Sequence, residues 1–547
     1  MIFLNRFLER IRNEKKWQHI FLAGIVALGI FLRTVHFQSW MEFSPDQARD
    51  ATLIDKVLSG KESLPLLGAE SGNTGFKLGP IAYHWQYLSG LIFGPEPYNL
   101  AYPDLIFSIL ALPLFFFLMR KYFAADIALL LTFLMSTSFF LVKYARFAWN
   151  PNAAPFFSLL FVFSLLEMLD PKRKGTLLWS ALLGVSIGVS IQLHTLFIFI
   201  LPAVAGVGFL VWIKRGLFSW KAIAMVLACF LLVNWAQIYS DINRDAANSK
   251  LFFKAISGTS SEGGTLGRDL GLATACEVQA NIFNISSWGN IGKCMTWERA
   301  LLKKGSEMRW VFVFGTIFMT GGYMLLVSFL RREDDERRKD FLIVFALYAA
   351  ISFLVSIPVI TQVSARYYIT SFFIPFVLCG FWLVFLLKKR SAVWMTLSSI
   401  LAISMVLVLV GGNIRTLASW SKKLQHKSAS DSKTVFYGEL LDMTQYIREA
   451  ASDKKIGIVG DRAYMSRFFK PLEYVARGEG VELVNRQKNK GVQNTLTSFS
   501  LHKAVQKSKL SSGVYKDRPI ESYRSFGQVM ILKVQKEGDI HQNPDSR

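Results

Sequence analysis

The stretch of the chain best suited to chemistry is Ser44-Pro-Asp-Gln-Ala-Arg-Asp50, which holds two carboxylates and one guanidinium within five residues. Asp46, Arg49 and Asp50 have i, i+3 and i+4 spacing, so on a helix they share one face. A carboxylate held beside a cation can serve as a general base. The same carboxylate can also be no more than a favourable charge at a helix start. The heptapeptide alone leaves both interpretations open.

The residues around this motif predict a helix that starts at Pro45 and stops near Gly60. Ser44 is suited to the N-cap position and proline to the first helical position. Gln47 stands three residues after Ser44, which is the spacing of a capping box. The motif is therefore expected to sit on a well-started helix.

The composition indicates a membrane protein with many spans. The chain has 547 residues, of which 52% are hydrophobic and 14% aromatic, and its mean hydropathy is +0.33. These values are too apolar for a soluble domain. The net charge of +23 is attributed to positive cytoplasmic loops and to an outer site for an anionic, phosphate-bearing ligand, with no nucleic-acid partner.

We predict about eleven transmembrane helices from the apolar segments. They are 18–38, 102–119, 124–142, 152–169, two within 176–213, 219–239, 309–330, 341–358, 367–387 and 393–412. Residues 80–95 are apolar but short, and are expected to lie in the interface.

The distribution of Lys and Arg orients these spans. The N-terminal leader and the loops 120–121, 171–174, 214–215, 331–339 and 388–390 are basic, so they are expected in the cytoplasm. The long outer loops 39–79 and 240–308 and the shorter loops 143–151 and 359–366 then lie outside. We therefore predict a transmembrane catalytic domain over residues 1–413, in the bacterial inner membrane.

Residues 414–547 are polar and are predicted to form a soluble α/β domain outside the cytoplasm. A helix is expected at 437–451 and buried strands at 455–461 and 527–534. The tail after Lys536 is expected to be disordered.

Further polar residues gather at the predicted outer ends of spans. They are Lys77, His84, Tyr144, Arg146, Trp149, Asn150, Asn152, Gln192, His194, Gln362, Arg366, Tyr367 and Tyr368. The sequence has no P-loop, no Rossmann glycine fingerprint, no zinc spacing and no Gly-x-Ser-x-Gly elbow. A transporter would more often place ionisable residues within its spans.

These motifs resemble the polyprenyl-phosphate-sugar-dependent glycosyltransferases of the GT-C superfamily, the group of aminoarabinose transferases and protein O-mannosyltransferases. The family carries an acidic pair after span one, here Asp46-Gln47, and a Lys-Pro-Pro-like turn before an aromatic helix, here Lys77-Leu-Gly-Pro80. A later span begins with an Arg-Tyr pair, here Arg366-Tyr367. Many members end in a soluble outer α/β domain.

The resemblance implies transfer of a hexose or pentose from a polyprenyl phosphate to a lipid, glycan or protein acceptor, with inversion. Asp46 is the expected general base, and Lys77, Arg366 and Arg49 are expected to contact the phosphate. Tyr367 belongs to the same substrate-binding set. Since Gln47 replaces the usual second acid, Asp50 is the alternative catalytic carboxylate.

Several alternatives stay open at this stage. Arg146 and Trp149 either line a sugar subsite or belong to an interfacial aromatic belt. His84 and His194 are structural residues or ligands of a divalent metal ion. Cys276 and Cys294 share one outer loop, where a disulfide is expected. The competing functions are a flippase for a lipid-linked substrate and an O-antigen ligase or polymerase, the latter favoured by the long loop 240–308.

Overall fold

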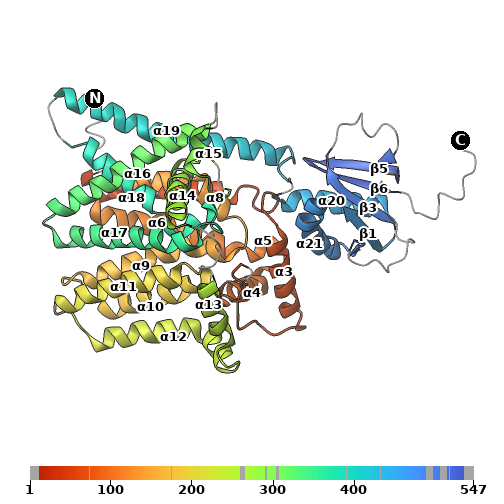
Figure 1. Ribbon diagram of the computed structural model, residues 1–547, viewed down its shortest axis with the longest axis horizontal. Helices are drawn as coiled ribbons and strands as arrows, with labels where there is room; N and C mark the ends of the chain where they lie inside the picture. The colour runs from red at the N-terminus through yellow and green to blue at the C-terminus, as the bar shows by residue number, and fades with distance from the viewer. Residues whose placement is uncertain are drawn as a thin grey trace, which may run out of the picture.

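The computed structural model describes residues 12–72, 74–173, 175–258, 265–289, 292–302, 307–388, 392–431, 433–451, 453–487, 497–504, 514–515 and 518–534. Figure 1 shows a bundle of long helices and, at one end of it, a separate α/β domain. The predicted tail after Lys536 lies outside the described residues. The predicted fold class, a polytopic helical protein with a C-terminal α/β domain, is confirmed.

Nine helical segments of the described chain are long and apolar enough to cross a membrane. They are α2 (Lys15–Thr34), α5–α6 (Pro97–Leu100, Tyr102–Tyr122), η1–α9 (Asn150–Ala153, Ala154–Leu169), α10 (Thr176–Leu193), α11 (Phe197–Lys214), α12 (Trp220–Ile242), α16 (Glu307–Arg332), α17–η3 (Glu336–Ser356, Ile357–Val359) and α19 (Ala392–Gln425).

Two of the eleven predicted spans differ from simple helices. The predicted span 367–387 is a bent pair, η4 (Ala365–Ser371) and α18 (Ile374–Leu386), with an angle of 66° between the two helices. The predicted span 124–142 is divided into α7 (Ala125–Thr137) and α8 (Phe139–Tyr144). Ser138 leaves the helical conformation there, and its hydroxyl donates to the Asn284 carbonyl at 2.6 Å. A side chain thus stabilises the break.

The predicted polar outer loop 240–308 is largely helical. It forms α13 (Ala247–Gly258), α14 (Leu266–Ser286) and α15 (Trp297–Leu302), and α14 is buried along most of its length. Its polar side chains bond to backbone groups of neighbouring segments: the Asn284 amide donates to the Phe372 carbonyl at 2.8 Å. Hydropathy alone missed this helix because its buried face carries amides and small residues.

The C-terminal domain combines two helices with a mixed sheet. The helices are α20 (Tyr437–Ala450) and α21 (Arg462–Gly478), and the sheet has the order β2-β1-β3-β6-β5-β4. β1 (Lys455–Gly460) runs parallel to β2 (Glu482–Asn485) and β3 (Ser498–Lys503), whereas β6 (Val529–Val534) is antiparallel to β3 and β5 (Arg518–Phe526). The short β4 (Val514–Tyr515) pairs with β5. The predicted helix and both predicted strands are confirmed.

The C-terminal domain is joined to the start of α3 (Pro45–Leu58) by paired backbone. The Phe43 amide donates to the Val435 carbonyl, and the Tyr437 amide donates to the Met41 carbonyl, both at 2.9 Å. Phe43 is buried and meets the rings of Tyr437 and Tyr474 edge-on. Helix α21 also packs on α3 (Figure 1). The helix with the acidic motif therefore lies between the bundle and the C-terminal domain.

Candidate functional site

Helix α3 begins as the sequence predicts. The Ser44 amide donates to Oε1 of Gln47 at 3.1 Å, which forms the capping box. The Gln47 amide nitrogen donates in turn to the Ala148 carbonyl at 3.0 Å. Gln47, which stands where the family usually has an acid, thus fastens α3 to the loop before α9 rather than facing outward.

The three charged residues of the motif lie together but differ in access. Arg49 pairs with Asp50, Nη2 to Oδ1 at 2.8 Å, and more loosely with Asp46, Nη1 to Oδ1 at 3.4 Å. The Asp46 side chain is 64% exposed, whereas that of Asp50 is 4% exposed. Of these two carboxylates, that of Asp46 is therefore open to solvent, and that of Asp50 is buried against the Arg49 guanidinium.

Tyr83 completes the environment of Asp50. It lies on α4 (Ile81–Phe93), and its hydroxyl donates to Oδ1 of Asp50 at 2.9 Å. Burial raises the pKa of Asp50 to about 6, although the nearby Arg49 opposes that shift. The carboxylate charge of Asp50 is therefore kept largely by its two partners.

A second cation, Arg366, approaches from η4. Its guanidinium is exposed, and Cζ lies 5.5 Å from the ring centroid of Trp149 and 5.3 Å from that of Tyr367. The charge of Asp46 is close enough to interact with it. Aromatic rings at this distance orient a guanidinium without neutralising it. We call Asp46, Arg49, Asp50, Tyr83, Arg366 and Tyr367 the outer polar cluster.

Lys77 lies on a hairpin, where its backbone pairs with that of Glu70. Its backbone is fixed by Asn248 of α13, which accepts from the Lys77 amide and donates to its carbonyl, both at 2.9 Å. The Lys77 side chain is exposed. Next to it, Gly79 must be glycine because a Cβ there would lie 2.3 Å from the Gln192 side chain. The Ile81 amide donates to that same side chain at 3.1 Å.

Arg146 is not brought to the outer polar cluster. It is 1% exposed, and its guanidinium donates to the carbonyls of Leu32, Arg33 and Val35 at 2.7 to 3.2 Å. These carbonyls end helix α2, and cations are favoured at helix C-termini. The geometry assigns Arg146 to the interior of the bundle and not to a sugar subsite.

The two histidines considered as metal ligands use their ring nitrogens in hydrogen bonds. His84 Nε2 donates to the Pro65 carbonyl at 3.1 Å, and His194 Nδ1 accepts from the Leu196 amide at 3.2 Å. Burial lowers the pKa of His194 to about 4, so its ring is neutral. Within the described part of the chain, no three His, Cys, Asp or Glu side chains form a metal-binding group.

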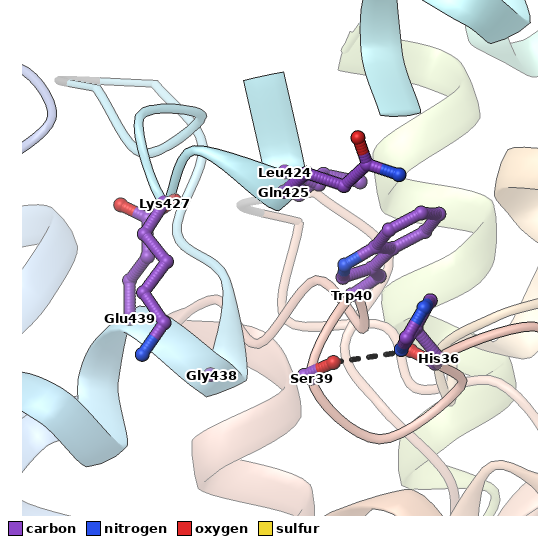
Figure 2. Close-up of a pocket in the computed structure, with 8 residues that line it drawn as sticks. All are labelled: His36, Ser39, Trp40, Leu424, Gln425, Lys427, Gly438 and Glu439. Carbon is purple, nitrogen blue, oxygen red and sulfur yellow. Dashed lines mark hydrogen bonds between the residues drawn. The ribbon is translucent and has the colours of Figure 1, made fainter. Parts of the chain in front are cut away.

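A cavity of about 260 Å³ lies at the junction of the two domains rather than at the outer polar cluster. Figure 2 shows His36 and Trp40 on one side of it and Lys427 and Glu439 on the other. The Glu439 carboxylate accepts from the Ala429 amide at 2.9 Å, and Lys427 pairs with Asp442. These charges therefore already have protein partners.

Three groups that shape the site make contacts that the sequence did not predict, although Gln192 was among the polar residues expected at outer span ends. Tyr83 and Asn248 act across long sequence separations, and Gln192 reaches the glycine turn from the end of α10. Tyr83 was one aromatic residue in an aromatic run, and Asn248 one amide in a polar loop. Only the packing of α4 and α13 against the motif reveals their contacts.

Comparison with known proteins rests on structure. No family model and no curated protein sequence matches the chain. The crystal structure of ArnT from Cupriavidus metallidurans bound to undecaprenyl phosphate aligns with a TM-score of 0.53 and 11% identity, covering 95% of this chain and 98% of that one. Its apo structure gives 0.50 at 11% identity with the same coverage. An oligosaccharyltransferase from Archaeoglobus fulgidus gives 0.45 at 12% identity, covering 88% of this chain and 68% of that one.

The alignment with ArnT runs through both the helical bundle and the C-terminal domain, because it covers nearly all of each chain. Together with the apolar helices, it identifies an integral membrane protein. This chain therefore shares the fold of ArnT over most of its length.

Proposed function

We propose that this protein is an integral-membrane glycosyltransferase that moves a sugar from a polyprenyl phosphate to a lipid, glycan or protein acceptor at the outer face of the membrane. The observation that carries the proposal is the exposed Asp46 carboxylate with Arg49 at 3.4 Å and the exposed Arg366 within electrostatic range. The fold supports it, since ArnT was solved with undecaprenyl phosphate.

The chemistry requires one carboxylate and a cationic surface. Asp46 takes the proton from an acceptor hydroxyl as that oxygen attacks the anomeric carbon. The bond between the anomeric carbon and the phosphate oxygen breaks, and its electron pair leaves with the lipid phosphate. Arg366, with Tyr367 beside it, and Lys77 stabilise the negative charge that the phosphate gains. A single displacement inverts the anomeric configuration.

Asp50 is given a positioning role in this scheme rather than that of a second base. Its side chain is buried, and its Oδ1 already accepts from Arg49 and Tyr83. It keeps the Arg49 guanidinium beside Asp46, 3.4 Å from its carboxylate. No step of the scheme passes through a metal ion.

The orientation follows from the same scheme. We place the N-terminus in the cytoplasm and the C-terminal domain outside, in the plasma membrane of a bacterial cell. In Figure 1 the C-terminal domain lies at the same end of the bundle as α3, α4 and α13. A reporter fused after Arg547 is expected outside the cytoplasm, and a cytoplasmic signal would contradict this placement.

The test is a transfer assay on the purified full chain in lipid vesicles. Radiolabelled polyprenyl-phosphate sugars are supplied with lipid, glycan and peptide acceptors, and the label is followed. We expect label to appear in an acceptor as the polyprenyl phosphate is released. If the labelled lipid crosses the vesicle membrane with its glycosidic bond intact, the protein is a flippase and the proposal fails.

A further inference from the structure

The residues Arg366 and Tyr367 lie on a short 3-10 segment, η4, which does not hold them by regular α-helical hydrogen bonding. The backbone just before them is held from outside. Ser364 forms an antiparallel bridge with Lys293, and the Ala365 amide donates to the Gly292 carbonyl at 3.2 Å. The position of η4 therefore depends on the segment 292–295.

That segment is in turn fastened to helix α14. A disulfide joins Cys294 to Cys276 of α14, as the sequence predicted. The Met295 amide donates to Oε1 of Gln279 at 3.0 Å, and the Gln279 amide nitrogen donates to the Lys293 carbonyl at 3.5 Å. Cys276 and Gln279 are three residues apart, so both attachments come from one face of α14.

The same helix also touches η4 directly. The buried Glu277 accepts from the Asn281 amide at 2.9 Å, and its charge interacts with the hydroxyl of Tyr368. Apolar side chains of α14, among them Ala273 and Ala280, pack with the buried residues on either side of Arg366. Two routes thus lead from α14 to η4, one through the disulfide-linked segment and one through this packed face.

We propose that the Cys276–Cys294 disulfide and Gln279 form a brace that positions Arg366 and Tyr367 for the phosphate of the donor, an inference that rests on the proposed function. These are positioning residues, because the brace acts through the backbone of residues 292–295 and 364–365. Loss of the brace frees η4 on one side and leaves the members of the outer polar cluster on α3 and α4 in place. The KM for the polyprenyl-phosphate sugar should therefore change, and the KM for the sugar acceptor should not.

The experiment compares two variants of the full chain with matched controls. The double variant Cys276→Ser/Cys294→Ser removes the covalent link, and Gln279→Ala removes the hydrogen bonds while keeping the disulfide. We expect the KM for the polyprenyl-phosphate sugar to rise by about tenfold in the first and about threefold in the second, with the acceptor KM unchanged. Cys229→Ser, which alters a free cysteine in α12, should change neither constant.

The action through Arg366 is tested by combination. Arg366→Ala alone should raise the donor KM, and adding the double cysteine variant should then raise it little further. Full additivity would overturn the brace. The brace would also be overturned if the donor KM rises in Arg366→Ala but stays unchanged in both brace variants. That result would leave the proposed function standing. No rise in Arg366→Ala itself would reject the phosphate contact and the brace with it.

Folding is controlled independently. Each variant is compared by thermal melting, and the wild-type protein is also reduced after folding, with loss of the disulfide verified by mass spectrometry. A rise in donor KM on reduction supports the brace even if the cysteine variant folds poorly. Reduction that leaves the donor KM unchanged overturns the role of the disulfide.

Discussion

Two groups of arginines serve opposite purposes in this protein. In the outer polar cluster, Arg49 and Arg366 are partly or largely exposed and lie near the exposed carboxylate of Asp46. Deeper in the bundle, Arg33 and Arg146 are 0% and 1% exposed. Their guanidinium groups bond mostly to carbonyl oxygens in and near α2, among them those of Gly29 and Ser136 for Arg33. We call Arg33 and Arg146 the buried arginine pair.

The contrast shows that exposure, together with the partner atoms, decides what an arginine can do. A guanidinium has five donors, and carbonyl oxygens of a helix end can use them without a counter-charge. Burial shuts such an arginine off from an incoming ligand, even though Nη2 of Arg33 and Nε of Arg146 have no hydrogen-bond partner among the described residues. Aromatic contact is common to both groups, since Arg146 lies 5.5 to 6.0 Å from the rings of Phe37, Trp40 and Trp420. Arg366 differs because it is exposed beside Trp149 and Tyr367, where an incoming anion can reach it.

The strongest test of this contrast is Asp46→Asn. The asparagine amide cannot take the proton from the hydroxyl group of the sugar acceptor, so we expect kcat to fall by about 10²- to 10⁴-fold. The side chain is exposed, so thermal stability should hardly change. Steady-state kinetics and melting curves of the same preparation check both parts. Turnover close to wild type would remove Asp46 as the base.

Arg146→Ala should have the reverse signature. It leaves the carbonyls of Leu32, Arg33 and Val35, at the C-terminal end of α2, without their guanidinium partner. A loss of about 3 kcal/mol or more in unfolding free energy is expected. Arg146→Lys, which keeps one donor group, should recover part of that loss. If the variant folds as well as the wild type but no longer binds the polyprenyl-phosphate sugar, the assignment of Arg146 to the interior is contradicted.

Arg366→Ala is expected to act between these extremes. Removing a charge-assisted contact to phosphate should raise the donor KM by about 10- to 100-fold, with melting unchanged. Arg366→Lys keeps the charge but loses the planar contact with Trp149, and should restore only part of the affinity. Equal effects on donor and acceptor constants would place Arg366 outside the phosphate site.

The pH profile gives a smaller effect. Asp50 has a pKa of about 6 because it is buried. Below that pH it becomes protonated and weakens its hold on Arg49, so kcat/KM should fall a few-fold as the pH drops through 6.

Since its pKa lies above the unfolded value of about 3.9, its stabilising contribution is present at low pH and lost as the pH rises from about 4 to 6. Asp50→Asn should remove both inflections, and an unchanged kinetic profile would rule out its hold on Arg49.

Tyr83→Phe should have the smallest effect of the series. It removes one hydrogen bond to Asp50, worth about 1 kcal/mol. The remaining partner, Arg49, still holds the carboxylate, so kcat should fall no more than about fivefold. An effect as large as that of Asp46→Asn would mean that Tyr83 itself meets the substrate. The control is Tyr87→Phe, a change on the same helix, with kcat measured for both variants in the same assay.

Much of the architecture could be predicted because it depends on short-range patterns. Membrane spans follow from runs of apolar residues, and the start of α3 follows from Ser44, Pro45 and Gln47. Helix α14 could not be predicted in this way. Its buried Asn284 bonds to the breaks in two other helices: the side chain donates to the Phe372 carbonyl, and the backbone carbonyl accepts from Ser138. Hydropathy treats such polar residues as exposed.

In the candidate site, too, local features could be predicted and long-range contacts could not. By itself the sequence determined that Asp46, Arg49 and Asp50 share one helical face, because helical spacing is a local property. Only the tertiary structure decided which carboxylate is exposed, since the burial of Asp50 comes from Tyr83 and α4. It also decided that Arg366 faces outward and Arg146 inward. Exposure and partner atoms arise from segments far apart in the chain, and no local pattern records them.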